Sequence, residues 1–294
     1  MAASDETYKA SPVKRHRRSK AELESVQKAL YEEIRQGPPY TVRQAYYQMS
    51  VQGVVPKTDP GYDLVQRELL KMRRAGKLPH SWVADSTRWM RKDPSYSNIK
   101  EALVAAAQAY RRSLWNEAPV YVEIWCEKDA LAGILSDVTI PYDVPLMVSR
   151  GFSSAPYLYS TGMHAARVGK PCYYYYFGDH DPSGVLIPKK VEEGITEFAP
   201  HAEIHFERVA VNEDQIRAWN LPTRPTKKTD SRAKTFVGES CELDAVPPAL
   251  LRELARDCIE RHIPPERLAR LKRQEEEERA TWLEAFSFLD KDAS

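Results

Sequence analysis

The sequence CYYYYFGDHDPSG spans residues 172–184 and joins an apolar aromatic run to a polar turn. Such a run, closed by Gly, Asp and Pro, is typical of a buried strand that ends in a loop. Further strand-like stretches are YVEIWCE (121–127), VPLMVS (144–149) and EIHFERVAV (203–211). Helical patterns lie between them, in DALAGIL (129–135) and over residues 155–168. The alternation of strands and helices predicts an α/β domain.

Acidic residues follow two of the predicted strands. Glu127 lies at the carboxyl end of the first, and Asp179 and Asp181 follow the aromatic run. Open α/β sheets bind ligands at this edge, and in an extended DxD both carboxylates point to the same side. Clustered carboxylates repel each other unless a hard cation neutralises them. The pattern therefore predicts a Mg²⁺ site, although each motif alone also fits an exposed strand end or an aspartate-capped turn.

The first part of the chain has the pattern of short helices. Helical spacing or N-capping residues mark three candidates, over residues 21–35, 42–52 and 62–75. The third carries a basic stripe that we expect to contact DNA, formed by Arg67, Lys71 and Arg74. Three short helices followed by the irregular segment KLPHSWVADSTR (77–88) predict a winged helix-turn-helix.

The composition favours a soluble globular protein with two modest cores, since 42% of the 294 residues are hydrophobic and 29% are charged. We expect a disordered basic tail over residues 1–20, a winged-helix domain over residues 21–117, and an α/β domain with C-terminal helices over residues 118–294. No run is apolar enough to cross a bilayer, and the start lacks the apolar block of a secretory signal. A cytoplasmic location is therefore expected, with nucleoid association in a prokaryote. The four cysteines lack paired spacing and are expected to be reduced and buried.

The net charge of +1 does not by itself indicate a nucleic-acid partner. Its distribution is more informative, because basic residues gather in three runs, one of which lies in residues 224–234. Lys227, Lys228 and Arg232 of this run are candidates for lining a DNA channel. Glu242 and Asp244 are candidates for completing the acidic cluster. A solvated loop explains either segment equally well.

The predicted helix over residues 42–52 carries two adjacent tyrosines. Four of its residues follow the spacing of a buried stripe: Val42, Ala45, Tyr46 and Met49. Tyr47 lies off this stripe, four residues after Arg43, and is expected to be exposed. A phenol beside a guanidinium suits attack on phosphorus, because the cation lowers the cost of the phenolate and then holds the phosphate oxygens.

The combination of these motifs resembles a known family. A glutamate that closes one strand and a DxD that closes a later one are similar to a Toprim domain. The segment 149–152 resembles the glycine-containing segment between these motifs in topoisomerase VI A subunits. The sequence RQAYY (43–47) is similar to the Arg-acidic-apolar-Tyr-Tyr motif of those subunits and of their meiotic double-strand-break relatives. It departs from that motif at Gln44, where the family has an acid, and at Ala45, where it has a larger residue. The resemblance covers residues 19–184 and keeps the order of the two domains.

The resemblance implies a type IIB topoisomerase A subunit, of the compact kind found in mobile elements. Tyr47 would attack a DNA phosphodiester and form a phosphotyrosine link, and Arg43 would steady the phosphate. Glu127, Asp179 and Asp181 would bind Mg²⁺, and Glu127 would also relay a proton. The family arrangement implies a homodimer that breaks both strands of double-stranded DNA. Because the chain has no phosphate-binding glycine loop, strand passage would require a separate ATP-hydrolysing subunit.

Other interpretations fit parts of the pattern. A Toprim-type nuclease would hydrolyse DNA at the metal site. A phosphohydrolase would use Asp179 as nucleophile and Asp181 as acid, which leaves Glu127 and the winged helix without a role. A DNA-binding regulator would keep the fold without catalysis.

Overall fold

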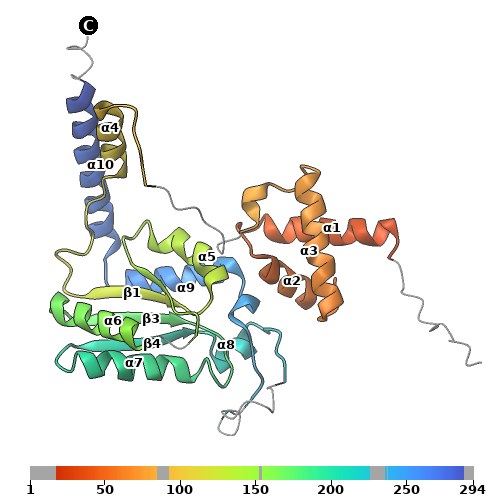
Figure 1. The fold of residues 1–294 in the computed structure, drawn as a ribbon. Helices are drawn as coiled ribbons and strands as arrows, with labels where there is room; N and C mark the ends of the chain where they lie inside the picture. Colours follow the sequence, from red (N-terminus) through yellow and green to blue (C-terminus); the bar gives the residue numbers. More distant parts are fainter. Residues whose placement is uncertain (1–17, 85–92, 152–153, 226–235, 237, 288–294) are drawn as a thin grey trace, which may run out of the picture.

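The computed structural model describes residues 18–84, 93–151, 154–225, 236 and 238–287. A helical N-terminal region is followed by a parallel sheet with interleaved helices (Figure 1). The N-terminal region comprises α1 (Lys20–Ile34), α2 (Val42–Val51), α3 (Asp59–Arg74) and the 3-10 helix η1 (His80–Trp82). The expected basic tail lies outside the described residues up to position 17, and the expected wing segment is described only as far as residue 84.

Polar caps fix where the N-terminal helices begin. The hydroxyls of Ser19 and Thr41 each accept a hydrogen bond from the amide three residues later, and both form capping boxes. Thr58 caps α3 in the same way, through the amide of Gly61. Behind the caps the three helices bury a shared apolar core that includes Leu30, Ile34, Ala45, Met49 and Leu69.

The sheet has four parallel strands in the order β2-β1-β3-β4. They are β1 (Tyr121–Cys126), β2 (Leu146–Val148), β3 (Cys172–Phe177) and β4 (Ile204–Ala210). Parallel strands need crossover connections, which α5 (Asp129–Thr139), α6 (Ala155–Val168) and α7 (Leu186–Phe198) supply. The helix α8 (Glu213–Ala218) follows β4. The prediction of an α/β domain is confirmed, and the sheet is Rossmann-like.

Both faces of the sheet are covered, which explains why β3 is apolar throughout. Side chains alternate along a strand, so Tyr174 and Tyr176 pack in one core with α6 and α7. Tyr175 and Phe177 face the opposite core, together with α5 and α9 (Pro248–Glu260). Cys126 and Phe177 pair with each other and are both fully buried there, so the carboxyl ends of β1 and β3 lie side by side.

The helix α4 (Ile99–Ala109) pairs with α10 (Pro265–Ser287), and the two project from the sheet (Figure 1). The Tyr110 hydroxyl, just after α4, donates to Glu278 at 2.5 Å, and its ring stacks on Trp282. Arg279 donates to the main-chain oxygen of Tyr110 at 2.9 Å. Although α4 belongs to the segment 21–117 predicted as the N-terminal domain, it therefore packs against the C-terminal helix.

Two further predictions concern the chemistry of the whole chain. All four cysteines are free and buried, as predicted. Among the described residues, no helix combines the length and the apolar character that a membrane span requires.

Candidate functional site

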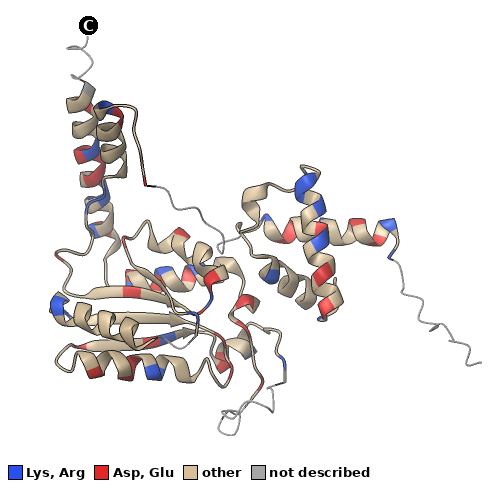
Figure 2. Cartoon of the chain, in the orientation of Figure 1, with Lys and Arg blue, Asp and Glu red and all other residues tan. Residues whose placement is uncertain are grey.

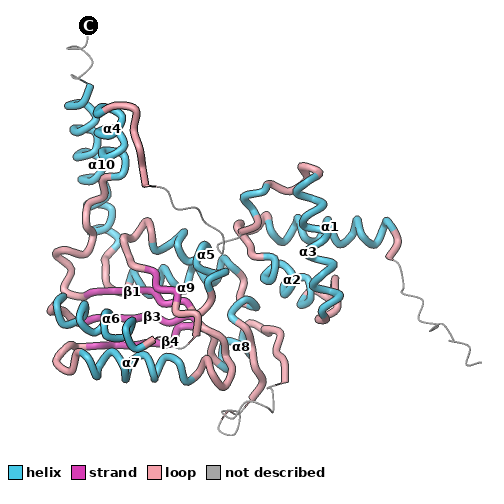
Figure 3. The backbone as a smooth tube through the Cα atoms, in the orientation of Figure 1, coloured by secondary structure: helices cyan, strands magenta, loops and turns pink. Residues whose placement is uncertain are grey.

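Acidic residues lie at the carboxyl ends of β1 and β3, where the sequence places them. Glu127 directly follows β1, and Asp179 comes two residues after β3. The Glu127 amide donates to the main-chain oxygen of Phe177 at 2.8 Å, and Oε2 of Glu127 accepts from the Asp179 amide at 3.0 Å. Glu127 and Asp179 lie in loops, and Figure 3 shows the strands of the sheet leading into loops. The site is therefore fixed to the rigid edge of the sheet.

The loop after β3 requires glycine at two positions. A Cβ on Gly178 would lie 2.6 Å from Oε2 of Glu127 and would overlap the Tyr176 ring. A Cβ on Gly184 would overlap the main-chain oxygen of Asp179. These glycines let the loop fold closely over Glu127, which also accepts a 3.0 Å hydrogen bond from the Tyr176 hydroxyl.

Arg208 of β4 fastens the same loop, a role that its ordinary position in a strand does not reveal. Its guanidinium donates to the main-chain oxygens of Gly178, Asp179, Gly184 and Val211 at distances from 2.6 to 3.2 Å. Burial lowers the pKa of the Arg208 guanidinium, and all three of its nitrogens donate to main-chain oxygens. Arg208 therefore sets the path of the chain on which both aspartates lie.

The two aspartates of the DxD do not share a partner. Oδ1 of Asp179 accepts from the Leu243 amide at 2.8 Å. Oδ1 of Asp181 instead accepts from the amides of Ser183 and Gly184 at 3.0 and 2.7 Å, as an aspartate that caps a turn does. The chain turns at Asp181, so the extended geometry on which the expected common direction of the two carboxylates depends ends there.

The segment that carries Glu242 and Asp244 adds two carboxylates to the cluster. Both residues are candidates for this position from the sequence alone. Cys241 pairs with His180 through two main-chain hydrogen bonds of 2.8 and 2.9 Å. The 3-10 helix η3 (Leu243–Ala245) follows, and both acidic side chains are buried. Pairing of the two loops thus brings these carboxylates beside Asp179.

The ammonium group of Lys128 lies among the carboxylates. Its Nζ is 2.9 Å from Asp179, 3.3 Å from Glu242 and 2.6 Å from Asp244. Burial alone would lower the pKa of Lys128, but the three carboxylates raise it well above its usual value. Burial raises the pKa of Asp179 to about 6, even though Lys128 opposes the shift. The position of Lys128 directly after Glu127 was the only sequence signal for this role.

Glu242 binds cations from three parts of the chain. Besides Lys128, it pairs with Arg43 of α2 at 2.7 Å and with Arg224 at 2.8 Å. Burial would raise the pKa of Glu242, but these cations together lower it to about 2. Glu242 therefore remains a carboxylate and joins the N-terminal helices to the acidic cluster.

The donor set is chemically suited to Mg²⁺, because it consists of carboxylate oxygens. The arrangement of these oxygens does not suit the ion. No three His, Cys, Asp or Glu side chains of the described residues are grouped so that they could hold a metal ion. Glu127 and Asp181 are turned toward donors of their own loops, and Lys128 occupies the point on which the other carboxylates converge. As the side chains lie, the predicted set of Glu127, Asp179 and Asp181 does not fit the ion.

Tyr47 is buried, with 6% of its surface exposed, so the expectation of an exposed phenol is wrong. The cause is tertiary: α2 packs against η3, and Gln48 donates to the main-chain oxygen of Ala245 at 3.2 Å. Burial first, and then Glu242, raises the pKa of the Tyr47 phenol, while Arg43 lowers it. The predicted proximity of Arg43 and Tyr47 is present, but it does not produce a phenolate.

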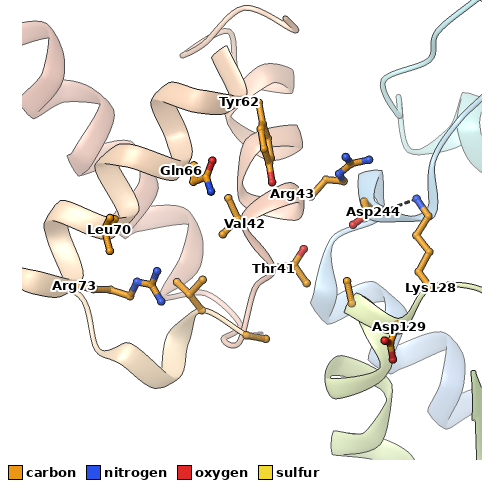
Figure 4. A pocket seen from close by; sticks show the side chains of 13 residues that line it. Thr41, Val42, Arg43, Tyr62, Gln66, Leu70, Arg73, Lys128, Asp129 and Asp244 are labelled. Atoms are coloured by element: carbon orange, nitrogen blue, oxygen red, sulfur yellow. Dashed lines mark hydrogen bonds and ion pairs between the residues drawn. The ribbon is translucent and has the colours of Figure 1, made fainter. Parts of the chain in front are cut away.

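A cleft of about 680 Å³ separates α2 and α3 from the start of α5 (Figure 4). Residues on its two sides include Arg43, Tyr62 and Arg73 from the helices and Lys128 and Asp244 from the sheet region. Figure 4 shows Lys128 and Asp244 joined by their ion pair at one end of this cleft. Of the cluster, Lys128 and Asp244 line this cleft, while the carboxylates themselves are buried.

Of the predicted DNA-contacting residues, Arg67, Lys71 and Arg74 lie on α3. Basic residues gather at the C-terminal end of α3 (Figure 2). Arg67 and Lys71 are half-exposed, but both pair with Glu68, which is fully buried. Lys227, Lys228 and Arg232 lie outside the described residues.

Comparison with known proteins adds no relative. A scan against models of protein families and a search of curated proteins both find no match to this chain. The resemblance to topoisomerase VI A subunits therefore depends on the motifs described above.

Proposed function

We propose that this chain cleaves DNA strands by transesterification, as a protein of the topoisomerase VI A-subunit type. In this proposal the N-terminal helices are a winged-helix DNA-binding domain and the sheet is a Toprim domain. Tyr47 is the nucleophile and Arg43 steadies the phosphate. Glu127, Asp179 and Asp181 are the acidic residues of the reaction centre.

One observation carries the proposal: α2 contacts the acidic cluster. Arg43 lies four residues before Tyr47 and pairs with Glu242, which in turn shares Lys128 with Asp179. Two motifs that are far apart in the sequence thus belong to one network of ion pairs. A nucleophilic hydroxyl, a guanidinium and clustered acids are the groups that phosphotyrosine chemistry on DNA needs.

The proposed step exchanges one phosphoester for another. The Tyr47 oxygen bonds to phosphorus, one P–O bond of the DNA backbone breaks, and the freed sugar oxygen takes up a proton. The phenol proton must pass to a base, for which the resemblance implies Glu127. Because Tyr47 is covered and its pKa is raised, α2 must separate from η3 before the phenol reaches DNA.

The partners in this proposal follow from the resemblance. They are double-stranded DNA, a second copy of the chain that brings its own Tyr47, and a separate ATP-hydrolysing subunit for strand passage. We extend the proposal to a Mg²⁺ requirement, although Lys128 takes the place of the ion in the present arrangement.

The decisive experiment is to incubate the purified chain with supercoiled plasmid and Mg²⁺ and to stop the reaction with denaturant. Protein covalently bound to broken DNA is expected, with the linked peptide containing Tyr47. Breaks without a protein link would indicate a hydrolytic nuclease instead. Binding without any break, with an excess of active sites and Mg²⁺ present, would indicate a DNA-binding regulator.

A further inference from the structure

Lys128 has as many N–H donors as there are carboxylates around its ammonium group. An ammonium group has three N–H donors, and Nζ of Lys128 lies within 3.3 Å of three carboxylates, those of Asp179, Glu242 and Asp244. Only 21% of the Lys128 side chain is exposed, so water competes little for these donors. The side chain thus fills the position that a bound cation would take.

The charges in this network also balance. Three carboxylates face three cations, because Glu242 additionally binds Arg43 and Arg224. With Lys128 in place, an added divalent ion would lie at close range to an ammonium, which repels it, and this network would have no net charge to attract it. Without the Lys128 charge, the same network would carry one net negative charge and would attract the ion.

We propose that Lys128 is the resident cation of the acidic cluster and keeps divalent metal ions out, so that a metal ion binds only when the Lys128 side chain withdraws. The cleft described above gives the ammonium a place to go, since Lys128 lines it. Metal binding is then in competition with an ion pair of the protein itself. The inference takes from the proposed function only the expectation that the cluster binds a divalent ion.

The direct test is calorimetric titration of the full chain with Mn²⁺, comparing wild type with Lys128→Met. Methionine keeps much of the length and apolar stem of lysine but removes the charge. The variant is expected to bind Mn²⁺ about tenfold more tightly or better. Lys190→Met is the matched control, because Lys190 also pairs with a carboxylate, Glu193, but on the exposed surface. Binding by Lys128→Met that is equal to wild type, weaker or absent would overturn the inference.

A second pair of variants covers the case in which Lys128→Met does not fold because its carboxylates repel one another. Asp244→Asn removes one of these negative charges. The double variant combines Asp244→Asn with Lys128→Met, so it differs from Asp244→Asn only by the loss of the ammonium group. The double variant is expected to bind Mn²⁺ more tightly and to gain more thermal stability from it. Equal binding by the two would reject the inference. Failure of the proposed function is seen separately, as tighter Mn²⁺ binding without any covalent Tyr47–DNA product.

Discussion

Arg43 of α2 donates a hydrogen bond of 2.7 Å to Glu242, which lies 199 residues later in the chain. The pair joins the helix that carries Tyr47 to the segment that pairs with the loop after β3. Gln44 and Gln48 of the same helix donate to the main-chain oxygens of Val246 and Ala245. These contacts of α2 therefore hold Tyr47 next to the acidic cluster and, at the same time, bury its side chain.

The first prediction concerns the pH dependence of stability at Glu242. Its pKa is lowered to about 2 in the folded chain, against a usual 4.5, so its contribution is fully present above pH 4.5 and is lost as the pH falls toward 2. Glu242→Gln should lower the free energy of unfolding at pH 7 by up to about 3 kcal/mol. Urea unfolding between pH 3 and 7 should show this difference from wild type shrinking below pH 4.5. Glu213→Gln, in an exposed pair with Arg217, is the control, and a difference that does not change with pH would contradict the prediction.

The second prediction distinguishes the two tyrosines. Tyr47→Phe removes only a hydroxyl, so folding should survive while protein-linked DNA ends disappear. Tyr46→Phe should retain much of the cleavage, because the Tyr46 hydroxyl donates only a 3.3 Å hydrogen bond to the main chain of Thr58. Denaturing gels of labelled DNA measure the linked product. Continued linkage in Tyr47→Phe would show that another residue is the nucleophile.

The third prediction concerns Arg208. Arg208→Met would remove the guanidinium donor from the buried main-chain oxygens of Asp179 and Gly184, each at a cost of about 1 to 2 kcal/mol. A loss of about 3 kcal/mol in the free energy of unfolding is expected, and Arg208→Lys should restore only part of it. Arg217→Met is the control, since its side chain is 73% exposed. Equal effects of Arg208→Met and Arg217→Met in denaturant unfolding would argue against a structural role for the guanidinium.

The fourth prediction concerns the basic stripe of α3. Each lost phosphate contact removes about one unit from the salt dependence of DNA binding, so replacing Arg67, Lys71 and Arg74 with alanine should reduce the slope by at most about three. We expect the slope to decrease by less than three, because Arg67 and Lys71 already pair with Glu68. Binding measured by fluorescence anisotropy over a series of salt concentrations gives the slope. An unchanged slope would place the DNA elsewhere on the protein.

Features encoded by local pattern could be predicted from the sequence. The aromatic run of β3 is buried on both faces, and Ala155–Val168 forms α6 over the predicted residues. Glu127 and Asp179 follow their strands because strand ends are set by local chain chemistry. The glycines on either side of the DHDPS segment can likewise be recognised as turn residues from the sequence.

Only the tertiary structure decided which side chains contact one another and whether each is buried or ion-paired. Helical periodicity placed Tyr47 outside the buried stripe of α2, but it carries no information about η3, which covers the other side of that helix. The convergence of Asp179, Glu242 and Asp244 on Lys128 depends on pairing between loops that are far apart in the sequence. The physical reason is that burial and ion pairing depend on distances in space, whereas a sequence pattern reports only neighbours within one helix or strand.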